Sequence, residues 1–388
     1  MRRIYLDYNA STPIDPAVAA AMRNYLHEHY GNPSSGHWAA APAKAALETA
    51  RRQVAVLLGC QPDEVVFTSG GSEANNLAIK GVFFALTDKG DHIITSAIEH
   101  PATVAPCRFL ERLGANVTYL PVDRYGLVDA DDVRRAITPR TILISIMHAN
   151  NETGTIQPMQ EVSRIAREHG VLLHTDAAQS IGKIPTDVNQ LGVDLLSIAG
   201  HKLYAPKGVG ALYVRSGTPL EPLIHGAGHE FGRRAGTESA LLAVGLGTAC
   251  ELARDLTPME RVRTLRDRFW EALQMHFGDR VVLNGHLEDR LPNTLNVAFV
   301  GRIGAEILAQ LPGLAASTGS ACHEGRVELS PVLKAMDIVP EVGMGAIRFS
   351  LGRGTTGEEI DAAVESLAVA LTAGPLRPEG ATRSWVQA

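Results

Sequence analysis

The sequence predicts an α/β fold in which a mostly parallel sheet carries helices on both faces. Between residues 43 and 215, helix-like segments alternate with short strand-like runs, and this alternation is typical of strand–helix–strand units. Near residue 255 the pattern changes to a long charged helix followed by more widely separated strands. The 388 residues also exceed the roughly 250–300 at which a single core stops growing. We therefore expect a large domain and a second, smaller one.

Hydrophobic periodicity places the elements of the first part in order. Each expected helix has apolar residues three or four positions apart, and each expected strand is a short apolar run. The expected helices are residues 43–58, 73–86, 102–113, 129–136 and 159–169. The expected strands are residues 65–68, 92–96, 116–120, 141–147 and 171–175, followed by an apolar run at 193–199.

The second part is expected to hold more helices than strands. The same periodicity predicts helices at 237–254, 259–276, 304–311, 331–336 and 357–371 and strands at 280–283, 294–300 and 314–318. Residues from Gly374 onward are rich in Pro, Gly, Arg and Thr and are expected to form a loose tail. The segment 5–33 near the N-terminus is expected to cross between the domains.

Composition excludes several classes of function. The chain is 45% hydrophobic and 20% charged, as in an ordinary soluble enzyme, and its net charge of −6 argues against a nucleic acid or an anionic membrane as the main partner. The four cysteines have neither the density of a disulfide framework nor metal-ligand spacing, so no metal site is expected. Neither a signal peptide nor a membrane-spanning run is recognisable, and we expect a cytoplasmic protein.

Lys202 and Asp176 each follow an apolar run and should project from strand ends of one sheet. Lys202 comes shortly after the run 193–199, and Asp176 ends the run 170–175. A partly desolvated lysine loses its proton more readily and can form a Schiff base with an aldehyde. A carboxylate can keep a pyridine nitrogen protonated. The pair predicts a pyridoxal phosphate site at the carboxyl ends of the strands.

A phosphate site is expected where the strand at 65–68 turns into the next helix. The turn reads Ser69-Gly70-Gly71-Ser72. Glycines admit close backbone approach, and Ser72 together with the free N–H groups of the helix N-terminus can face an anion.

Taken together, nine motifs resemble those of the cysteine desulfurases in the class V aminotransferase group, over nearly the whole chain. They are Leu6-Asp7-Tyr8-Asn9-Ala10-Ser11-Thr12-Pro13, Thr68-Ser69-Gly70-Gly71-Ser72-Glu73, Glu99-His100, Ala149-Asn150-Asn151-Glu152-Thr153-Gly154, His174-Thr175-Asp176-Ala177-Ala178-Gln179, Gly200-His201-Lys202, Arg233-Arg234-Ala235-Gly236-Thr237-Glu238, Gly319-Ser320-Ala321-Cys322 and Arg348-Phe349-Ser350-Leu351-Gly352-Arg353.

The resemblance implies the type I pyridoxal-phosphate transferase fold. Its large domain, expected at residues 15–255, contains a mostly parallel seven-stranded sheet. Residues 1–14 and 256–388 are expected to form a smaller α+β domain, which carries a catalytic cysteine loop at about residues 317–331.

The resemblance also implies roles for individual residues. Lys202 carries the cofactor, Asp176 pairs with its pyridinium nitrogen, Gln179 bonds its phenolic oxygen, and His100 stacks over the ring and assists proton transfer. Phosphate contacts come from Gly71, Ser72 and His201, and from Thr237 of a second subunit, which implies a homodimer with shared active sites. Arg348 binds the α-carboxylate of the substrate, and Asn151 bonds that carboxylate or the ring oxygen of the cofactor. Ala199 departs from the pattern, because many relatives have a serine there.

By the same resemblance, Cys322 carries the reaction. It attacks the sulfur of L-cysteine as a thiolate, L-alanine leaves, and the persulfide passes to a sulfur-acceptor protein. His323 or Arg326 could depress the pKa of its thiol. Cys60, Cys107 and Cys250 lie in or beside apolar segments and are expected to be inert. The acceptor and its pathway have no readable motif.

Alternative functions remain open at this point. Selenocysteine lyase shares the scaffold, and three features favour it: His323 directly after Cys322, the sequence Leu329-Ser330-Pro331-Val332-Leu333, and the non-serine residue at 199. Another reaction of the same cofactor, such as transamination or epimerisation, would leave Cys322 incidental. A non-catalytic sulfur-transfer scaffold would not need the charged groups at the strand ends. A nicotinamide enzyme is disfavoured because no Gly-x-Gly-x-x-Gly run opens a first βα unit.

Overall fold

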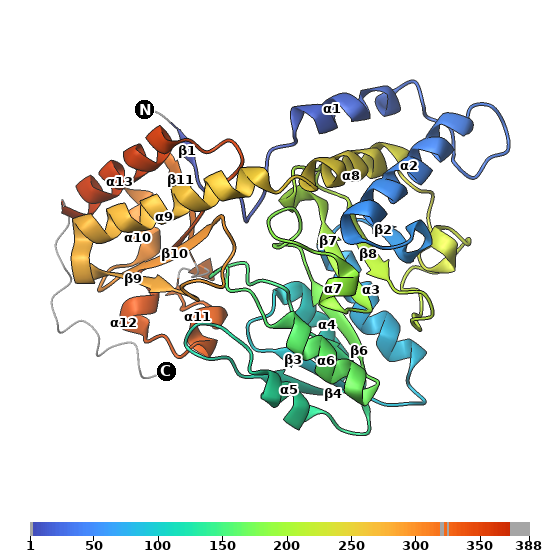
Figure 1. Ribbon diagram of the computed structural model, residues 1–388, viewed down its shortest axis with the longest axis horizontal. Coiled ribbons are helices and arrows are strands. Elements are labelled where there is room, and N and C mark those ends of the chain that lie inside the picture. Colours follow the sequence, from blue (N-terminus) through green and yellow to red (C-terminus); the bar gives the residue numbers. More distant parts are fainter. Residues whose placement is uncertain (1–2, 319–321, 324–325, 373–388) are drawn as a thin grey trace.

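A seven-stranded sheet forms the centre of the larger lobe of the computed structural model, which describes residues 3–318, 322–323 and 326–372 (Figure 1). Its spatial order is β2-β8-β7-β6-β5-β3-β4. All neighbouring pairs are parallel except the two made by β8, which runs antiparallel to both β7 and β2. The expected mostly parallel seven-stranded sheet is confirmed. Its strands are β2 (Val65–Thr68), β3 (His92–Ser96), β4 (Asn116–Leu120), β5 (Thr141–Ser145), β6 (Leu172–Asp176), β7 (Leu195–Ala199) and β8 (Gly210–Val214).

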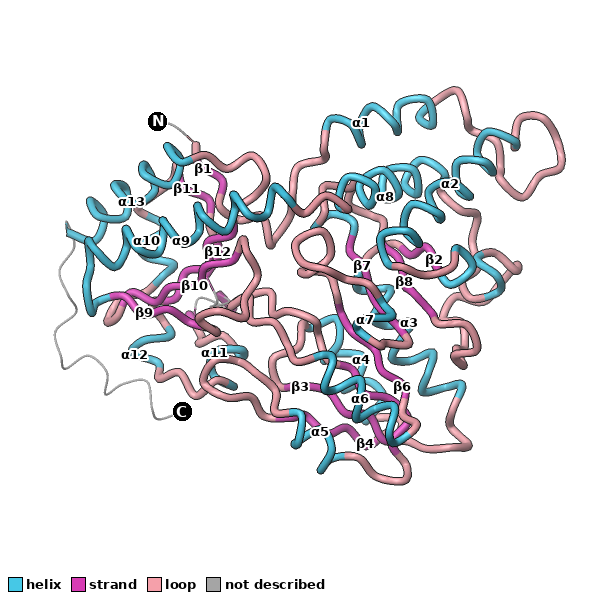
Figure 2. Tube along the Cα trace, viewed as in Figure 1, coloured by secondary structure: helices cyan, strands magenta, loops and turns pink. Residues whose placement is uncertain are grey.

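Helices cover both faces of this sheet, as the alternating sequence pattern predicted (Figure 2). Neighbouring strand residues face opposite layers, as the two-residue repeat of a strand requires. Ile94 and Leu196, for example, belong to one buried cluster, whereas Ile93 and Leu195 belong to another. The helices of this lobe are α1 (Pro16–Met22), α2 (Ala41–Leu58), α3 (Gly71–Ala85), α4 (Pro101–Glu111), α5 (Ala130–Ala136), α6 (Met159–His169), α7 (Val188–Leu191) and α8 (Ala240–Ala253).

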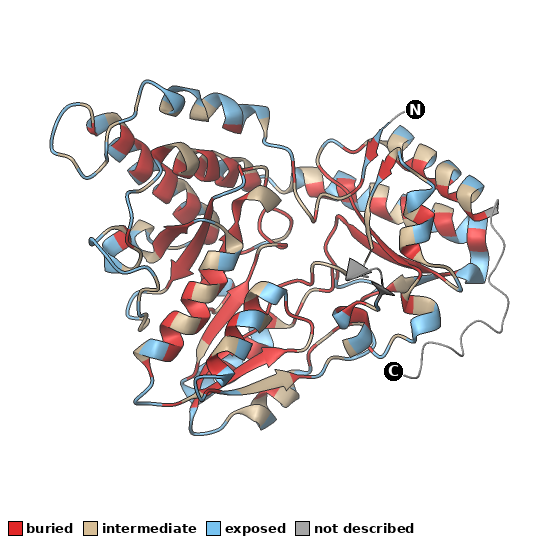
Figure 3. Ribbon diagram, turned by 180° about the vertical axis from the view of Figure 1, so that it is seen from behind, coloured by how far each residue is buried: buried red, intermediate tan, exposed pale blue. Residues whose placement is uncertain are grey.

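A four-stranded antiparallel sheet, in the order β12-β15-β10-β9, forms the smaller lobe. The N-terminal strand β1 joins this lobe by pairing in parallel with β11, and Ile4 and Leu6 are buried in its core (Figure 3). The strands are β1 (Ile4–Tyr5), β9 (Val281–Asn284), β10 (Thr294–Phe299), β11 (Leu314–Ala315), β12 (Ser317–Thr318), β13 (Cys322–His323), β14 (Arg326–Val327) and β15 (Ala346–Ser350), and the helices are α9 (Thr257–Phe277), α10 (Gly304–Ala309), α11 (Pro331–Ala335), α12 (Pro340–Gly343) and α13 (Gly357–Thr372). The domain limits 15–255 and 1–14 with 256–388 stay a prediction.

The structure differs from the expected elements in a few places. Strand β8 was not predicted, although Gly210–Val214 is an apolar run that follows β7 closely. The single strand expected at 314–318 is divided at Ala316, so β11 and β12 belong to different sheets. Helix α8 begins after Ser239 rather than at 237, because the Ser239 side chain accepts a hydrogen bond from the N–H of Leu242 and caps the helix. No helix in the described ranges is long and apolar enough to cross a membrane.

Candidate active site

A cavity of about 380 Å³ lies where β3, β5, β6 and β7 end and α3 begins. Its volume falls within the range of about 300–1,000 Å³ that is typical of small-molecule sites. Asn9 and Ala10 from the N-terminal segment and Arg348 from the smaller lobe close it. The predicted site residues that line it are Gly71, Ser72, His100, Asn151, Asp176, Gln179, His201, Lys202 and Arg348.

Lys202 is partly buried in a short 3-10 turn directly after β7. Its ammonium donates hydrogen bonds to the backbone oxygens of Asn9 and Ala10. Loss of hydration, together with the positive charge of Arg348, lowers the pKa of Lys202 to about 8, although Asp176 and Asp7 act in the opposite direction. A substantial fraction of the amine is therefore unprotonated near neutral pH, as a nucleophilic lysine requires.

Asp176 is buried at the carboxyl end of β6, and the protein fixes both of its oxygens. Oδ2 accepts a hydrogen bond of 2.6 Å from the Asn75 side chain, and Oδ1 accepts one of 2.9 Å from the N–H of Ala178. Asn75 was not predicted as a site residue. A signal was present, since it lies four positions after Gly71 and therefore on the same face of α3.

The N-terminus of α3 forms one end of the cavity. Gly70 has φ of 153°, a conformation that other residues rarely adopt, and it turns the chain sharply from β2 into the helix. A Cβ added to Gly71 would lie 3.0 Å from the Cβ of Ala199, so the small residues at both positions let the helix terminus approach β7 closely. Ala199 provides no hydroxyl group, and three of the four predicted phosphate ligands, Gly71, Ser72 and His201, line the same cavity.

Both predicted histidines are held in a largely neutral form. The His100 Nδ1 accepts a hydrogen bond of 3.1 Å from the N–H of Ala102, so in this tautomer the proton is on Nε2. Loss of hydration lowers the pKa of His100, opposed by Asp176 and reinforced by Lys202. Loss of hydration and the charge of Lys202 lower the pKa of His201 to about 4.

Arg348 projects from β15 into the cavity and is buried. One Nη atom donates to Asp7 Oδ1 at 2.9 Å, and the other donates to the backbone oxygen of Asn151 at 2.9 Å. The Nε of Arg348 is buried and has no partner among the described residues, and each Nη atom carries a second N–H group. Because a buried donor without a partner is rare in folded proteins, Nε is a candidate to bind an acceptor from a ligand.

Strand β12, the last described segment before Cys322, lies beside Arg348. Ser317 of β12 lies opposite Arg348 in the antiparallel pair of β12 and β15, and its hydroxyl donates to Asp7 Oδ1 at 2.9 Å. Cys322 lies five positions after Ser317 in the sequence, and an extended chain covers at most about 3.6 Å per residue. Cys322 therefore lies within about 18 Å of Ser317.

After Cys322, the chain contacts the neighbourhood of the site again at Ser330, which bonds to Glu152, the residue after Asn151. The Ser330 hydroxyl donates to Glu152 Oε2 at 2.6 Å and caps helix α11. The backbone of Cys322 belongs to β13, which pairs with β14. The described residues of the predicted loop of about 317–331 thus include three short strands, β12, β13 and β14, and residues 319–321 and 324–325 lie outside the described residues.

The other three cysteines are poor nucleophiles, as expected. Burial raises the pKa of Cys60 and of Cys107 to about 12, and it raises the pKa of Cys250 further. Thiols with such pKa values are almost entirely protonated near neutral pH, and the thiolate is the reactive form.

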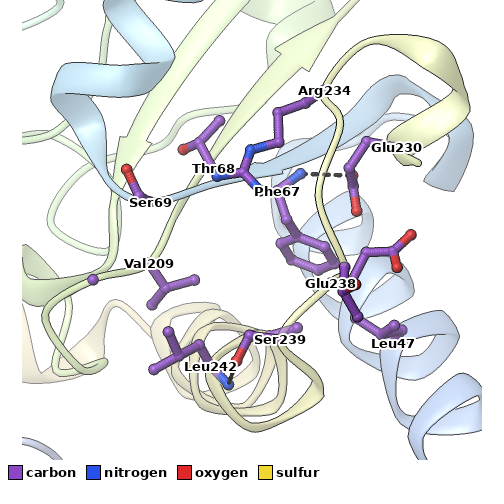
Figure 4. A pocket seen from close by; sticks show the side chains of 13 residues that line it. Leu47, Phe67, Thr68, Ser69, Val209, Glu230, Arg234, Glu238, Ser239 and Leu242 are labelled. Carbon is purple, nitrogen blue, oxygen red and sulfur yellow. Dashed lines mark hydrogen bonds between the residues drawn. The ribbon is translucent and has the colours of Figure 1, made fainter. Parts of the chain in front are cut away.

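Thr237 is absent from this cavity. It is exposed and lines a second cavity, of about 170 Å³. The side chains of Thr68, Ser69 and Arg234 line the same cavity (Figure 4). Thr68 and Ser69 directly precede the turn that forms the phosphate end of the first cavity. Within one chain, Thr237 therefore lies outside the predicted phosphate site.

Asn9 connects the parts of the site, a role that the sequence did not indicate. Its backbone oxygen accepts hydrogen bonds from Lys202 and Gln179. Its side chain contacts Thr294 of the smaller lobe and Lys183 of the larger one. No metal-binding group of three or more His, Cys, Asp or Glu residues occurs within the described ranges.

Comparison with known proteins gives a consistent result. The profile of the Aminotransferase class-V family matches residues 4–363. The chain is 50% identical over 370 residues to a protein named cysteine desulfurase IscS from Dictyoglomus turgidum, with 94% of each chain covered. It is 47% identical over 369 residues to a protein of the same name from Pectobacterium carotovorum, covering 93% of this chain and 91% of that protein.

Solved structures agree with the sequence comparison. A NifS-like protein has a TM-score of 0.90 at 38% identity, covering 96% of this chain and all of the other. A structure titled SspA in complex with cysteine has a TM-score of 0.81 at 39% identity, with 91% of this chain and all of the other covered. This chain belongs to the class-V aminotransferase family, and within it to the cysteine desulfurases.

Proposed function

We propose that this enzyme is a pyridoxal-phosphate-dependent cysteine desulfurase, which converts L-cysteine to L-alanine and leaves the sulfur as a persulfide on Cys322. One observation carries the proposal. A single cavity brings together the low-pKa amine of Lys202, the fixed carboxylate of Asp176 and the unpaired Nε of Arg348, next to strand β12, which precedes Cys322 in the chain. The names of the similar proteins, and the cysteine complex of one of them, support the same reaction.

The residues of the cavity fit pyridoxal phosphate. When bound, the cofactor supplies an aldehyde for the amine and a protonated ring that accepts electron density. Asp176 would hold the ring nitrogen, and His100 would cover the ring and exchange protons through Nε2. The N-terminus of α3 would hold the phosphate, because its free N–H groups and dipole favour an anion. The phosphate would be held by Gly71, Ser72 and His201, with Thr237 of the partner subunit, and the ring oxygen would be held by Gln179 and Asn151.

Arg348 would bind the substrate carboxylate, and Asn151 would assist it. Asp7 and the Asn151 backbone already fix the guanidinium, so the unpaired Nε can be offered to the ligand with little loss of side-chain freedom. Lys202 would move the α-proton. Cys322 Sγ would take the sulfur as the Cβ–S bond of the substrate breaks.

The proposal extends to the assembly. We propose a homodimer, because Thr237 is exposed and lies outside the cavity of its own chain. A sulfur-acceptor protein would receive the persulfide from the Cys322 segment. We also propose that the chain divides into one domain at residues 15–255 and a second at residues 1–14 with 256–388. The support is that each lobe has a buried hydrophobic cluster of its own.

The test is a single-turnover reaction of the protein reconstituted with pyridoxal phosphate. With L-cysteine we expect one alanine for each persulfide, and mass mapping should place the added sulfur on the peptide that contains Cys322. Pyruvate or D-cysteine as the product would instead identify another reaction of the cofactor. Rejection of L-cysteine with turnover of L-selenocysteine would identify a selenocysteine lyase, and failure to bind the cofactor would indicate a non-catalytic scaffold.

Replacing Arg348 by lysine should weaken substrate binding. Lysine keeps the charge but loses the planar fork that binds a carboxylate through two hydrogen bonds. Breaking such a buried pair costs about 2–4 kcal/mol, so kcat/KM for L-cysteine should fall by about 30- to 1,000-fold, mainly through KM. Steady-state kinetics would measure this change, and Arg52→Lys on the exposed face of α2 is the matched control. An unchanged KM would exclude Arg348 from carboxylate binding.

A further inference from the structure

Lys183 is a buried lysine that the proposed chemistry does not use. It lies in the turn after β6, with only 8% of its surface exposed. No Asp or Glu of the described residues lies within ion-pair distance of its amine. Instead, Nζ donates to two side-chain carbonyl oxygens, Gln179 Oε1 at 2.9 Å and Asn9 Oδ1 at 3.3 Å. Lysine is almost never fully buried without a charged partner, and an unpaired buried cation is destabilising. A contribution to the stability of the fold therefore does not explain why a lysine stands at position 183.

Both acceptors of Lys183 also contact the catalytic lysine or its neighbours. Gln179 Nε2 donates to the backbone oxygen of Asn9 at 3.0 Å, and the amine of Lys202 donates to that same oxygen. The Gln179 amide and Lys202 therefore meet at one atom, in the cavity that both residues line. Lys183 donates to the side chains of both Gln179 and Asn9, and it therefore links the two residues that meet at this atom.

The contact with Lys183 determines which way the Gln179 amide points. A carboxamide can rotate by half a turn, which exchanges its two donors for an acceptor. Because Lys183 donates to Oε1, the NH₂ group must face Asn9 and the cavity. One N–H bonds to Asn9, and the second remains for a ligand. In the reversed orientation, Oε1 would face the ring oxygen of a bound cofactor and repel it.

The amine of Lys183 can serve both carbonyl oxygens in either protonation state. It has at least two N–H groups whether or not it is protonated, which matches the two carbonyl oxygens that it contacts. Loss of hydration lowers its pKa well below the ordinary value, and the positive charges of Lys202 and Arg348 lower it further.

We propose that Lys183 is a positioning residue, which fixes the Gln179 carboxamide with its NH₂ group toward the ring oxygen of the cofactor. The inference rests on the proposed function, because it takes pyridoxal phosphate as the ligand of this cavity. Lys183 would act through Gln179 and would not contact the substrate or the cofactor.

The experiment combines Lys183→Met with Gln179→Ala and measures the absorption of the bound cofactor as a function of pH, besides kcat and KM. In the wild-type background, Lys183→Met should lower kcat by about three- to tenfold, as for the loss of one hydrogen bond, with KM nearly unchanged. It should also shift the midpoint of the absorption titration. Gln179→Ala should shift it in the same direction, and the double variant should shift it no further than Gln179→Ala alone.

Two further variants separate positioning from folding. Lys183→Gln keeps an NH₂ donor and should recover part of the titration shift. Lys44→Met, which replaces an exposed lysine on α2, should change nothing. An unshifted titration in Lys183→Met, or an equal effect of that change with and without the Gln179 side chain, would overturn the proposal. If Lys183→Met does not fold, Lys183→Gln is compared with the wild-type protein instead. An unshifted midpoint of the absorption titration in Lys183→Gln would then overturn the proposal. A wild-type protein that binds no pyridoxal phosphate would instead refute the proposed function, and the positioning role with it.

Discussion

Replacing Lys202 by alanine is expected to lower kcat for L-cysteine by about 10⁴-fold, because it removes both the nucleophile and the proton-transfer group. The cavity should survive, since among the described residues the Lys202 amine donates hydrogen bonds to the backbone oxygens of Asn9 and Ala10 alone, and water can replace these contacts. The variant should therefore still bind pyridoxal phosphate through the α3 N-terminus, but without the visible absorption that reports a covalent bond to lysine.

The pH dependence of cofactor capture gives this prediction a second readout. Only the neutral amine attacks an aldehyde, and the pKa of Lys202 is lowered to about 8 from its ordinary value of 10.5. The rate at which the cofactor-free protein captures pyridoxal phosphate should therefore rise as pH increases through about 8 and level off above it. Stopped-flow absorbance would measure this rate.

Controls make the Lys202 prediction specific. Lys89→Ala, at an exposed position after α3, should behave like the wild-type protein in both measurements. A capture rate that keeps rising toward pH 10.5 would mean that the amine is hydrated like a free lysine. Residual turnover within tenfold of the wild-type rate in Lys202→Ala would exclude Lys202 as the nucleophile.

The local parts of the site could be predicted from the sequence. Lys202 and Asp176 each follow a short apolar run. Where such runs alternate with helices along the chain, each run forms a strand, and the residues that follow the run mark the end of the strand. The turn at Gly70 could be predicted for a similar reason, because short-range backbone geometry determines where glycine is needed. The family resemblance supplied the roles that such patterns do not specify.

The contacts between distant segments could not be predicted in this way. Asn9 meets Lys183 and Thr294 across separations of 174 and 285 residues, and no periodicity in one segment indicates a side-chain contact in another. The unpaired Nε of Arg348 depends in the same way on where Asp7 and Asn151 come to lie. Strand β8 was missed because the antiparallel strand interrupts the helix–strand alternation from which the sheet was inferred.

Replacing Cys322 by alanine should abolish sulfur transfer, with a loss of about 10³-fold or more in sulfide released in the presence of a thiol. Sulfur that leaves L-cysteine needs an acceptor thiolate, and the remaining cysteines cannot supply one. Burial raises the pKa of both Cys60 and Cys107 to about 12. No persulfide should form on the variant.

Cys322→Ala should retain the cofactor and bind the substrate, because Lys202, Asp176 and Arg348 do not depend on the Cys322 side chain for their described hydrogen bonds. Addition of L-cysteine should therefore still change the absorption of the bound cofactor, while alanine formation stops. Cys60→Ala is the matched control. It removes a partly buried thiol that is distant in sequence from Cys322, and it should leave sulfur release unchanged. Alanine production by Cys322→Ala at the wild-type rate would show that another acceptor takes the sulfur without this thiol, and the role proposed for Cys322 would have to be abandoned.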